Sequence, residues 1–212
     1  MSVSDQDTTL TAVSRSAARY LDELKAVLGA LDLAQISTVI DRLRRTCERG
    51  GFVYIFGNGG SASTASHAVN DFNKGIDPVG PYRFRFVCLN DNVPTVLALA
   101  NDIGYETVFT RQLRNFVRAD DVVIAISGSG NSPNVVDAIR YAKRRGVETI
   151  ALVGYDGGRL LQLADYYIHV PIHDMQKIED VHLAMNHLMM TVLKRMLESP
   201  RREQGSAEGA SE

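Results

Sequence analysis

The sequence predicts an α/β fold in which helices cover both faces of a parallel sheet. Short, continuous apolar runs such as residues 52–56 are typical of strands that are buried on both faces. Segments with helical periodicity separate these runs, so strands and helices alternate along the chain. Strands joined through helices form right-handed βαβ units, and such units build a parallel sheet.

The predicted elements follow one another in a regular order. The strands are residues 52–56, 83–89, 122–126, 149–153 and 167–170. The helices that separate and follow them are residues 63–72, 93–100, 105–117, 133–145, 158–164 and 176–197. Every predicted strand is therefore followed by at least one helix, as a βαβ arrangement requires.

A long helical region precedes the first strand. Apolar side chains recur three or four residues apart from residue 8 to residue 48, with a break at residues 30–32. We expect a single domain over residues 8–198, in which residues 8–50 form helices at an oligomer interface. The reason is that these helices have more apolar surface than one small sheet can cover. The polar ends, residues 1–7 and 199–212, are predicted to be disordered.

Composition and charge exclude several classes of protein. The 212 residues carry a formal net charge of −2, which argues against a nucleic-acid partner bound through a basic surface. No apolar stretch approaches the roughly 20 residues that span a bilayer, and the polar N-terminus does not resemble a secretory signal. The two cysteines, Cys47 and Cys88, lack metal-ligand spacing, so we expect a protein of the reducing cytoplasm.

Two loops rich in glycine and serine each follow a predicted strand. They are Gly57-Asn58-Gly59-Gly60-Ser61 and Ser127-Gly128-Ser129-Gly130-Asn131-Ser132. In a parallel sheet both lie at the carboxyl edge, where ligands bind, and each leads into the N-terminus of a helix. Glycines allow close approach of the backbone to an anion, and serine hydroxyls can donate to phosphate oxygens. Neither loop matches a nucleotide P-loop or a dinucleotide fingerprint, so we expect another phosphorylated ligand.

An alternative explanation of these loops is that they are ordinary turns with capping serines. That explanation suffices for one loop taken alone. Two such loops at the same edge of one sheet favour a binding site for phosphate.

With these loops, the sequence resembles the sugar isomerase (SIS) domain family, and within it most closely the phosphoheptose isomerases. The resemblance extends from the N-terminal helices to about Leu197. Besides the two loops, it rests on His67, on the segment Ile178-Glu179-Asp180-Val181-His182 and on His187. The resemblance implies a flavodoxin-like fold with a five-stranded parallel sheet, and a homotetramer.

The resemblance also implies an activity and a substrate. Members of this type convert D-sedoheptulose 7-phosphate to D-glycero-D-manno-heptose 7-phosphate through an enediol or enediolate. By the same resemblance, the substrate is bound by Asn58, Gly59, Gly60, Ser61, Asn90, Asp91, Ser127, Gly128, Ser129, Ser132 and Glu179. The second loop is expected to hold the phosphate and the first to line the sugar.

The family further carries a metal or acid–base cluster, made of a His and a Glu four residues apart and a Gln and a His eight apart. The matching positions here are His67, Asp71, Glu179 and His187. Asp71 stands for the usual Glu and Glu179 for the usual Gln, and Gly128 stands where Thr is common. Two imidazoles and two carboxylates suit Zn²⁺, which could polarise the sugar oxygens.

Isomerisation moves a proton between two adjacent carbons, so it needs a base and an acid. Asp71 is the candidate base and His187 the candidate acid. His67 and Asp71 are four residues apart and therefore share one helix face. Two other functions remain open: isomerisation of a different phosphosugar, and a non-catalytic SIS protein that senses a sugar phosphate or binds a protein.

Overall fold

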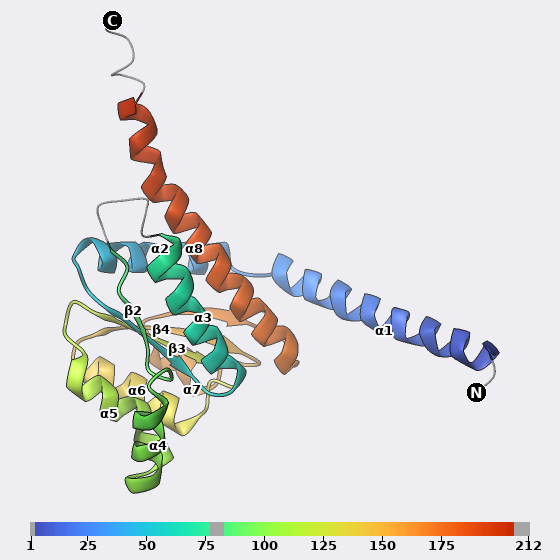
Figure 1. The fold of residues 1–212 in the computed structure, drawn as a ribbon, viewed down its shortest axis with the longest axis horizontal. Coiled ribbons are helices and arrows are strands. Elements are labelled where there is room, and N and C mark those ends of the chain that lie inside the picture. Colours follow the sequence, from blue (N-terminus) through green and yellow to red (C-terminus); the bar gives the residue numbers. More distant parts are fainter. Residues whose placement is uncertain (1–2, 77–82, 206–212) are drawn as a thin grey trace, which may run out of the picture. The chain divides into compact units, whose positions relative to one another are not determined.

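The computed structural model describes residues 3–76 and 83–205 (Figure 1). It divides the chain into two compact units, Met1–Leu31 and Asp32–Glu212. The boundary coincides with the break in apolar periodicity at residues 30–32. The second helix therefore belongs to the α/β unit and not to an N-terminal arm.

The first unit is a single helix, α1 (Val3–Gly29). Its large apolar side chains are exposed: Leu10, Val13 and Leu21 each retain at least 60% of their accessible surface. Disorder was predicted for residues 1–7, but α1 begins at Val3. Residues 1–2 lie outside the described residues.

The second unit contains a five-stranded parallel sheet in the order β2-β1-β3-β4-β5. The strands are β1 (Val53–Gly57), β2 (Phe86–Cys88), β3 (Val122–Ser127), β4 (Glu148–Gly154) and β5 (Tyr166–Val170). The predicted fold class is thus confirmed. β2 is shorter than the predicted strand 83–89, since this edge strand pairs only with β1, from Val53↔Phe86 to Ile55↔Cys88.

Helices cover both faces of this sheet (Figure 1). One face carries α2 (Leu33–Glu48), α3 (Gly60–Gly75) and α8 (Met175–Gly205). The other carries α5 (Val108–Phe116), α6 (Pro133–Arg144) and α7 (Gly158–Leu163). Side chains of β3 alternate between the layers: Val123 and Ala125 join the core with α5 and α6, while Ile124 and Ile126 face α3 and α8.

α8 extends beyond its predicted end. It continues to Gly205, whereas disorder was predicted from residue 199. The segment after Pro200 reads Arg-Arg-Glu-Gln, and these residues have high helix propensity, so a polar composition alone was a poor guide. Residues 206–212 lie outside the described residues. In the part of the chain that is described, no helix carries an apolar stretch of membrane-spanning length.

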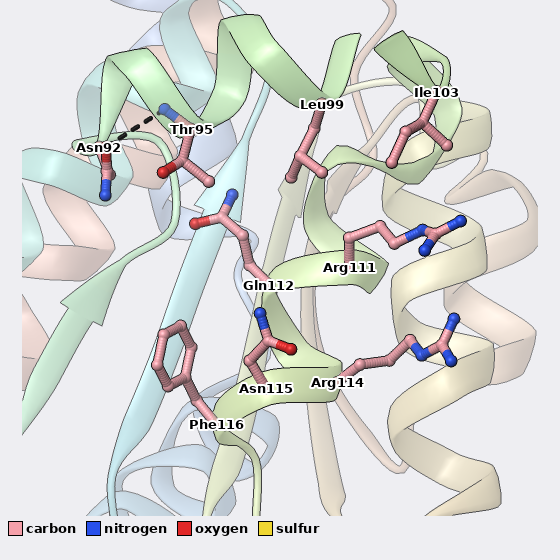
Figure 2. A pocket seen from close by; sticks show the side chains of 9 residues that line it. All are labelled: Asn92, Thr95, Leu99, Ile103, Arg111, Gln112, Arg114, Asn115 and Phe116. Atoms are coloured by element: carbon pink, nitrogen blue, oxygen red, sulfur yellow. Dashed lines mark hydrogen bonds between the residues drawn. The ribbon is translucent and has the colours of Figure 1, made fainter.

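Two further helical elements connect β2 to α5. They are α4 (Val93–Asp102) and a short 3₁₀ helix, η1 (Tyr105–Thr107). α4 has no buried residue, although its sequence is largely apolar. Side chains of α4 and α5 enclose a hollow of about 510 Å³, which is lined mainly by polar groups (Figure 2). This hollow lies on the face of the sheet opposite α3 and α8.

Candidate active site

The two glycine- and serine-rich loops lie side by side because their strands are neighbours. β1 pairs with β3 from Val53↔Val122 to Gly57↔Ile126, and both strands end at the same edge. The strand order reverses direction at this pair, which makes it the topological switch point of the sheet. Open α/β sheets bind ligands at this point, so the fold supports the predicted location.

A cavity of about 160 Å³ lies between the two loops and the start of α8. We call it the loop cavity, and its lining residues are Asn58, Ser61, Ile126, Ser127, Gly128, Ser129, Ser132, Met175 and Glu179. Most of the predicted substrate-binding residues are therefore brought together. Gly59, Gly60, Asn90 and Asp91, which were also predicted, are not among the lining residues.

The serines of the loops do not cap the helices that follow. α3 has Gly59 as its N-cap, which has no side chain to accept a hydrogen bond. Ser132 is the N-cap of α6, yet its side chain makes no capping bond. Ser127 and Ser129 instead accept hydrogen bonds within their own loop, from the Gly130 amide at 3.2 Å and from the Asn131 amide at 3.3 Å. The explanation of these serines as helix caps is thus not supported, although two of them do stabilise the turn. Hydroxyl groups and the positive ends of two helices remain available at the cavity for an anion.

A network of hydrogen bonds fixes Asn58 between the two loops. The amides of Asn58 and Asn134 bond reciprocally, both at 2.9 Å, and the hydroxyl of Tyr105 donates to Asn58 Oδ1 at 2.8 Å. Neither Asn134 nor Tyr105 was predicted from the sequence. The one feature of the sequence that could have indicated Asn134 is its position directly after the second loop, in the first turn of α6.

The second loop is held in a tight conformation. Gly130 has a φ of 63°, and a Cβ there would lie 2.0 Å from the carbonyl oxygen of Gly157. The Arg159 amide donates to Asn131 Oδ1 at 3.1 Å, and the Arg159 guanidinium donates to the Asn131 carbonyl at 2.6 Å. Only glycine fits at residue 130, so the backbone of the loop is fixed before any ligand arrives.

Asn90 stabilises the end of β1. Its Oδ1 accepts from the Gly57 amide at 3.2 Å, and its Nδ2 donates to the Gly57 carbonyl at 2.9 Å. Both polar atoms of this side chain are therefore used within the protein. Asp91 is exposed beside it. Contact of either residue with a sugar stays a prediction.

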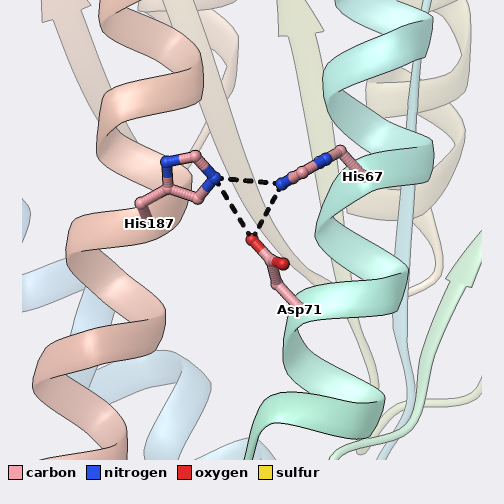
Figure 3. A group of neighbouring side chains, drawn as sticks. All are labelled: His67, Asp71 and His187. Carbon is pink, nitrogen blue, oxygen red and sulfur yellow. Dashed lines mark hydrogen bonds and ion pairs between the residues drawn. The ribbon is translucent and has the colours of Figure 1, made fainter.

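A second group of functional side chains lies on α3 and α8. The Nε2 atoms of His67 and His187 are 2.9 Å apart, and Asp71 Oδ2 lies 3.2 Å from the first and 3.5 Å from the second (Figure 3). We call these three residues the His–Asp cluster. The Asn186 amide donates to Asp71 Oδ2 at 2.8 Å and so orients this carboxylate. This role of Asn186 was not predicted from the sequence.

His182 does not belong to the cluster. It is 1% exposed, and within the described residues neither of its ring nitrogens has a hydrogen-bond partner. Burial lowers its pKa to about 4, and the nearby backbone of Val153 opposes this shift in part. His182 is thus a neutral residue of the core, on the face of α8 that is turned towards the sheet.

The donor atoms of the His–Asp cluster fit a zinc ion. With ligand bonds of about 2.0–2.2 Å, tetrahedral zinc places two ligand atoms about 3.3 Å apart. The distances of 2.9, 3.2 and 3.5 Å among the three atoms lie around that value. Three protein ligands would leave one position open, as in catalytic zinc sites.

The loop cavity and the His–Asp cluster lie on the same two helices. α3 and α8 run in parallel, because Gly60 is next to Glu179, His67 next to His187 and Gly75 next to Met190. His67 is six residues beyond Ser61, which corresponds to about 9 Å along a helix. The pair of helices therefore carries the loop cavity at one end and, about two turns further, the His–Asp cluster.

Comparison with known proteins agrees with this arrangement. The sequence profile of the SIS domain matches residues 19–154, which is more than half of the chain. This chain belongs to the SIS domain family.

Relatives of this SIS domain are named as isomerases. The chain is 33% identical over 166 residues to the phosphoheptose isomerase of Thermodesulfovibrio yellowstonii, covering 78% of this chain and 82% of the relative. It is 35% identical over 182 residues to the phosphoheptose isomerase of Akkermansia muciniphila, with coverage of 80% and 93%. The structure of a phosphoheptose isomerase from Neisseria gonorrhoeae superimposes with a TM-score of 0.76 at 27% identity, covering 90% of this chain and 99% of that one.

Two residues at which this SIS domain departs from the pattern of its family lie at the loop cavity. Glu179 was predicted as a metal ligand, but its carboxylate packs against Gly60, where a Cβ would lie 2.3 Å from Oε2. Eight residues of helix, about 12 Å, separate it from His187, so the structure brings together three of the four predicted ligands. At Gly128 a Cβ would lie 2.5 Å from the sulfur of Met175, which occupies the space of a larger side chain.

Proposed function

We propose that this SIS domain is an aldose–ketose isomerase that converts D-sedoheptulose 7-phosphate to D-glycero-D-manno-heptose 7-phosphate. The observation that carries the proposal is the presence of the loop cavity and the His–Asp cluster on one pair of helices. The first suits a phosphate group, and the second suits proton transfer. The names of the relatives support the same activity.

The spacing of the two sites supports a long sugar phosphate. Six carbon–carbon bonds of about 1.5 Å give an extended seven-carbon chain a length of about 8 Å. This length is close to the rise of about 9 Å along α3 between Ser61 and His67. With its phosphate in the loop cavity, a heptose can present its first two carbons to the His–Asp cluster.

We assign the phosphate to Ser127, Ser129 and Ser132 with the backbone of their loop, and the sugar to Asn58 and the start of α3. The fixed backbone at Gly130 supports this assignment, because a rigid loop loses little entropy when it binds an anion. The hydrogen bonds that orient Asn58 likewise reduce the entropy that its side chain would lose on binding the sugar.

We assign proton abstraction to Asp71. Its Oδ2 faces the two histidines and the Asn186 amide, whereas its Oδ1 has no partner among the described residues and is the atom that can take a proton from the sugar. In a metal-free site His187 gives and takes the proton on the neighbouring oxygen while the enediolate exists, whereas a zinc ion held at its Nε2 would supply the stabilisation of that oxygen instead. His67 holds the carboxylate and the second imidazole in position.

We infer that His67, Asp71 and His187 hold a zinc ion, which when bound would polarise the oxygens on the first two carbons of the sugar. The donor set and the distances within it support this inference. Glu179 is too far along α8 to join the same ion without a movement of its side chain.

An assay of ketose phosphates, with metal analysis of the same preparation, tests the proposal. We expect turnover of sedoheptulose 7-phosphate, about one zinc per chain, and loss of both zinc and activity on chelation. A clearly better substrate of another length would assign the protein to a different phosphosugar. Tight phosphosugar binding without any turnover would indicate a sensor. Full activity of metal-free protein would remove zinc from the mechanism.

Glu179→Gln is expected to lower KM for the phosphosugar about fivefold. The carboxylate lines the loop cavity and repels a bound phosphate. Two unit charges some 6 Å apart interact by about 0.7 kcal/mol at the dielectric constant of water and by about 3 kcal/mol at that of a protein surface, and the fivefold change corresponds to about 1 kcal/mol, near the solvated end of this range. Steady-state kinetics measure the effect, and Glu198→Gln on an exposed part of α8 is the matched control. A higher KM would instead make Glu179 an acceptor of hydrogen bonds from the sugar.

We further propose a homotetramer in which α1 contacts neighbouring subunits. A single helix cannot bury its own apolar face, and Leu10, Val13 and Leu21 are exposed on α1. Light scattering on the full chain tests the mass of the assembly, and a monomer would contradict the proposal. A cytoplasmic location stays a prediction from the two cysteines, which are both buried and free.

A further inference from the structure

Four arginines gather between α5 and α6, on the face of the sheet opposite the His–Asp cluster. They surround a hollow of about 300 Å³, here called the arginine hollow. Its lining residues are Glu106, Thr107, Thr110, Arg111, Arg114, Asp137, Arg140 and Arg144. Four guanidinium groups and two carboxylates leave a charge of +2, although the whole chain carries −2.

Most of this positive charge is not neutralised within the protein. Arg140 pairs with Asp137 at 3.1 Å, but Arg111, Arg114 and Arg144 have no ion pair or hydrogen bond of their side chains among the described residues. Like charges three or four residues apart on a helix destabilise it, and Arg111 and Arg114 are such a pair, as are Arg140 and Arg144. The hydroxyl oxygen of Thr110 in the same hollow is buried and has no hydrogen-bond partner in residues 3–76 and 83–205. An anion would relieve the repulsion.

The arginine hollow adjoins the larger hollow of about 510 Å³ between α4 and α5. Arg111 and Arg114 line both, and Figure 2 shows them extending together from one side of α5. The larger hollow contains an aromatic ring, Phe116, which is 56% exposed. Figure 2 shows this ring on the opposite side of α5 from Arg111 and Arg114, so the larger hollow has an apolar surface at one end and guanidinium groups at the other. Such an arrangement is suited to an elongated ligand with a flat group at one end and phosphates at the other.

Amide groups with unused hydrogen-bonding capacity accompany this ring. Asn115 makes no side-chain hydrogen bond among the described residues. Gln112 donates to the carbonyls of Leu89 and Val108, which leaves its Oε1 as an acceptor. Asn92 accepts from the Thr95 amide and keeps its Nδ2 donors. Donors and acceptors of this kind can read the edge of a nucleobase.

We propose that the two hollows together form a binding site for a nucleoside di- or triphosphate. The phosphates would lie among Arg111, Arg114, Arg140 and Arg144, because guanidinium groups bind phosphate oxygens in a bidentate manner. The base would stack on Phe116 with its edge towards the amides. The site is separate from the loop cavity and the His–Asp cluster, with which it shares no residue.

The shape and charge of the site favour a small molecule over a nucleic acid. Binding along a phosphate backbone needs a basic stripe with many contacts, and such proteins usually have a strongly basic surface. Here the unpaired arginines surround one concave site on a chain with a net charge of −2.

Isothermal titration of the full-length protein with ATP, ADP, pyrophosphate and adenosine tests the proposal. We expect ATP and ADP to bind, pyrophosphate to bind more weakly, and adenosine alone not to bind at millimolar concentration. Affinity should fall as salt is added, because ion contacts are replaced. A single-stranded oligonucleotide that binds more tightly than ATP would overturn the proposal in favour of a nucleic-acid surface.

Variants locate the binding. Arg111→Ala and Arg140→Ala should each weaken ADP binding about tenfold, since each removes charge-assisted hydrogen bonds. Phe116→Ala should reduce the affinity for ADP to that for pyrophosphate. Arg145→Ala is the matched control, because Arg145 is the C-cap residue that directly follows Arg144 at the end of α6 but lies outside the hollow.

Two results would overturn the proposal. One is the absence of binding by ATP and ADP at millimolar concentration. The other is binding that is unaffected by the arginine variants but lost in Ser129→Ala, which would place the nucleotide in the loop cavity. Because these titrations measure binding without turnover, their outcome is independent of whether the protein isomerises a heptose phosphate.

Discussion

Asp71→Asn is expected to lower kcat about 10²–10⁴-fold while changing KM little. Asparagine has the size of aspartate and can keep a contact with Asn186, but its amide cannot accept the proton that the base must remove. The loss should therefore appear in the chemical step and leave binding in the loop cavity intact. Steady-state kinetics with sedoheptulose 7-phosphate measure both constants.

Asp71→Glu separates a catalytic role from a structural one. It restores a carboxylate at this position, as the family commonly has, and we expect it to recover most of the activity. Asp102→Asn, at the exposed end of α4, is the control for a neutralised carboxylate away from the cluster. Activity of Asp71→Asn above a tenth of that of the unchanged protein would assign the base to another group.

Acidification from pH 7 to pH 4 is expected to reduce the free energy of unfolding by about 3 kcal/mol through His182 alone. The pKa of this residue is about 4 in the fold, against 6.5 for an ordinary histidine. Between these values the unfolded chain binds a proton that the folded chain does not, so stability falls with pH. A shift of about 2.5 units corresponds to about 3 kcal/mol. Below pH 4 both states carry the proton and the effect stops growing.

His182→Leu isolates this contribution. The variant lacks the titrating group, so its stability should fall less steeply over the same range than that of the unchanged protein. Chemical denaturation at a series of pH values measures the difference, and His173→Leu, on an exposed histidine, controls for the removal of an imidazole. Parallel pH curves for the two variants would show that His182 is not buried as a neutral ring.

Much of the fold could be predicted because it depends on local patterns. Apolar runs identified all of the observed strands, and the helical segments between them fixed the parallel direction. The ends of the helices were predicted less accurately. Residues 3–7 and 199–205 are helical although their composition suggested disorder, because a polar helix end needs no core to be stable once the rest of the helix has formed. The number of strands came from the resemblance, and the strand order was not predicted, since spacing alone does not determine it.

The candidate site could be predicted only where its residues form a contiguous motif in the sequence. The two loops are contiguous motifs at strand ends, so the sequence was sufficient to place them. Asn134, Asn186 and Tyr105 act through contacts across the fold, and asparagine and tyrosine are common surface residues without a spacing signal. Glu179 was grouped with the metal ligands from its position in a motif. In three dimensions, the rise of α8 places it at the cavity instead.

The reciprocal bonds between Asn58 and Asn134 join residues that are 76 positions apart in the chain. Two strands, β2 and β3, and four helical elements, α3, α4, η1 and α5, lie between them in the chain. The cavity therefore cannot exist in any partly folded form in which β3 has not yet joined β1. A bound phosphosugar therefore stabilises the folded state as a whole. Its contribution grows as RT ln(1 + [L]/Kd), so a substrate concentration 100 times Kd adds about 2.7 kcal/mol. In a cell, the lifetime of this protein would thus depend on the supply of its own substrate.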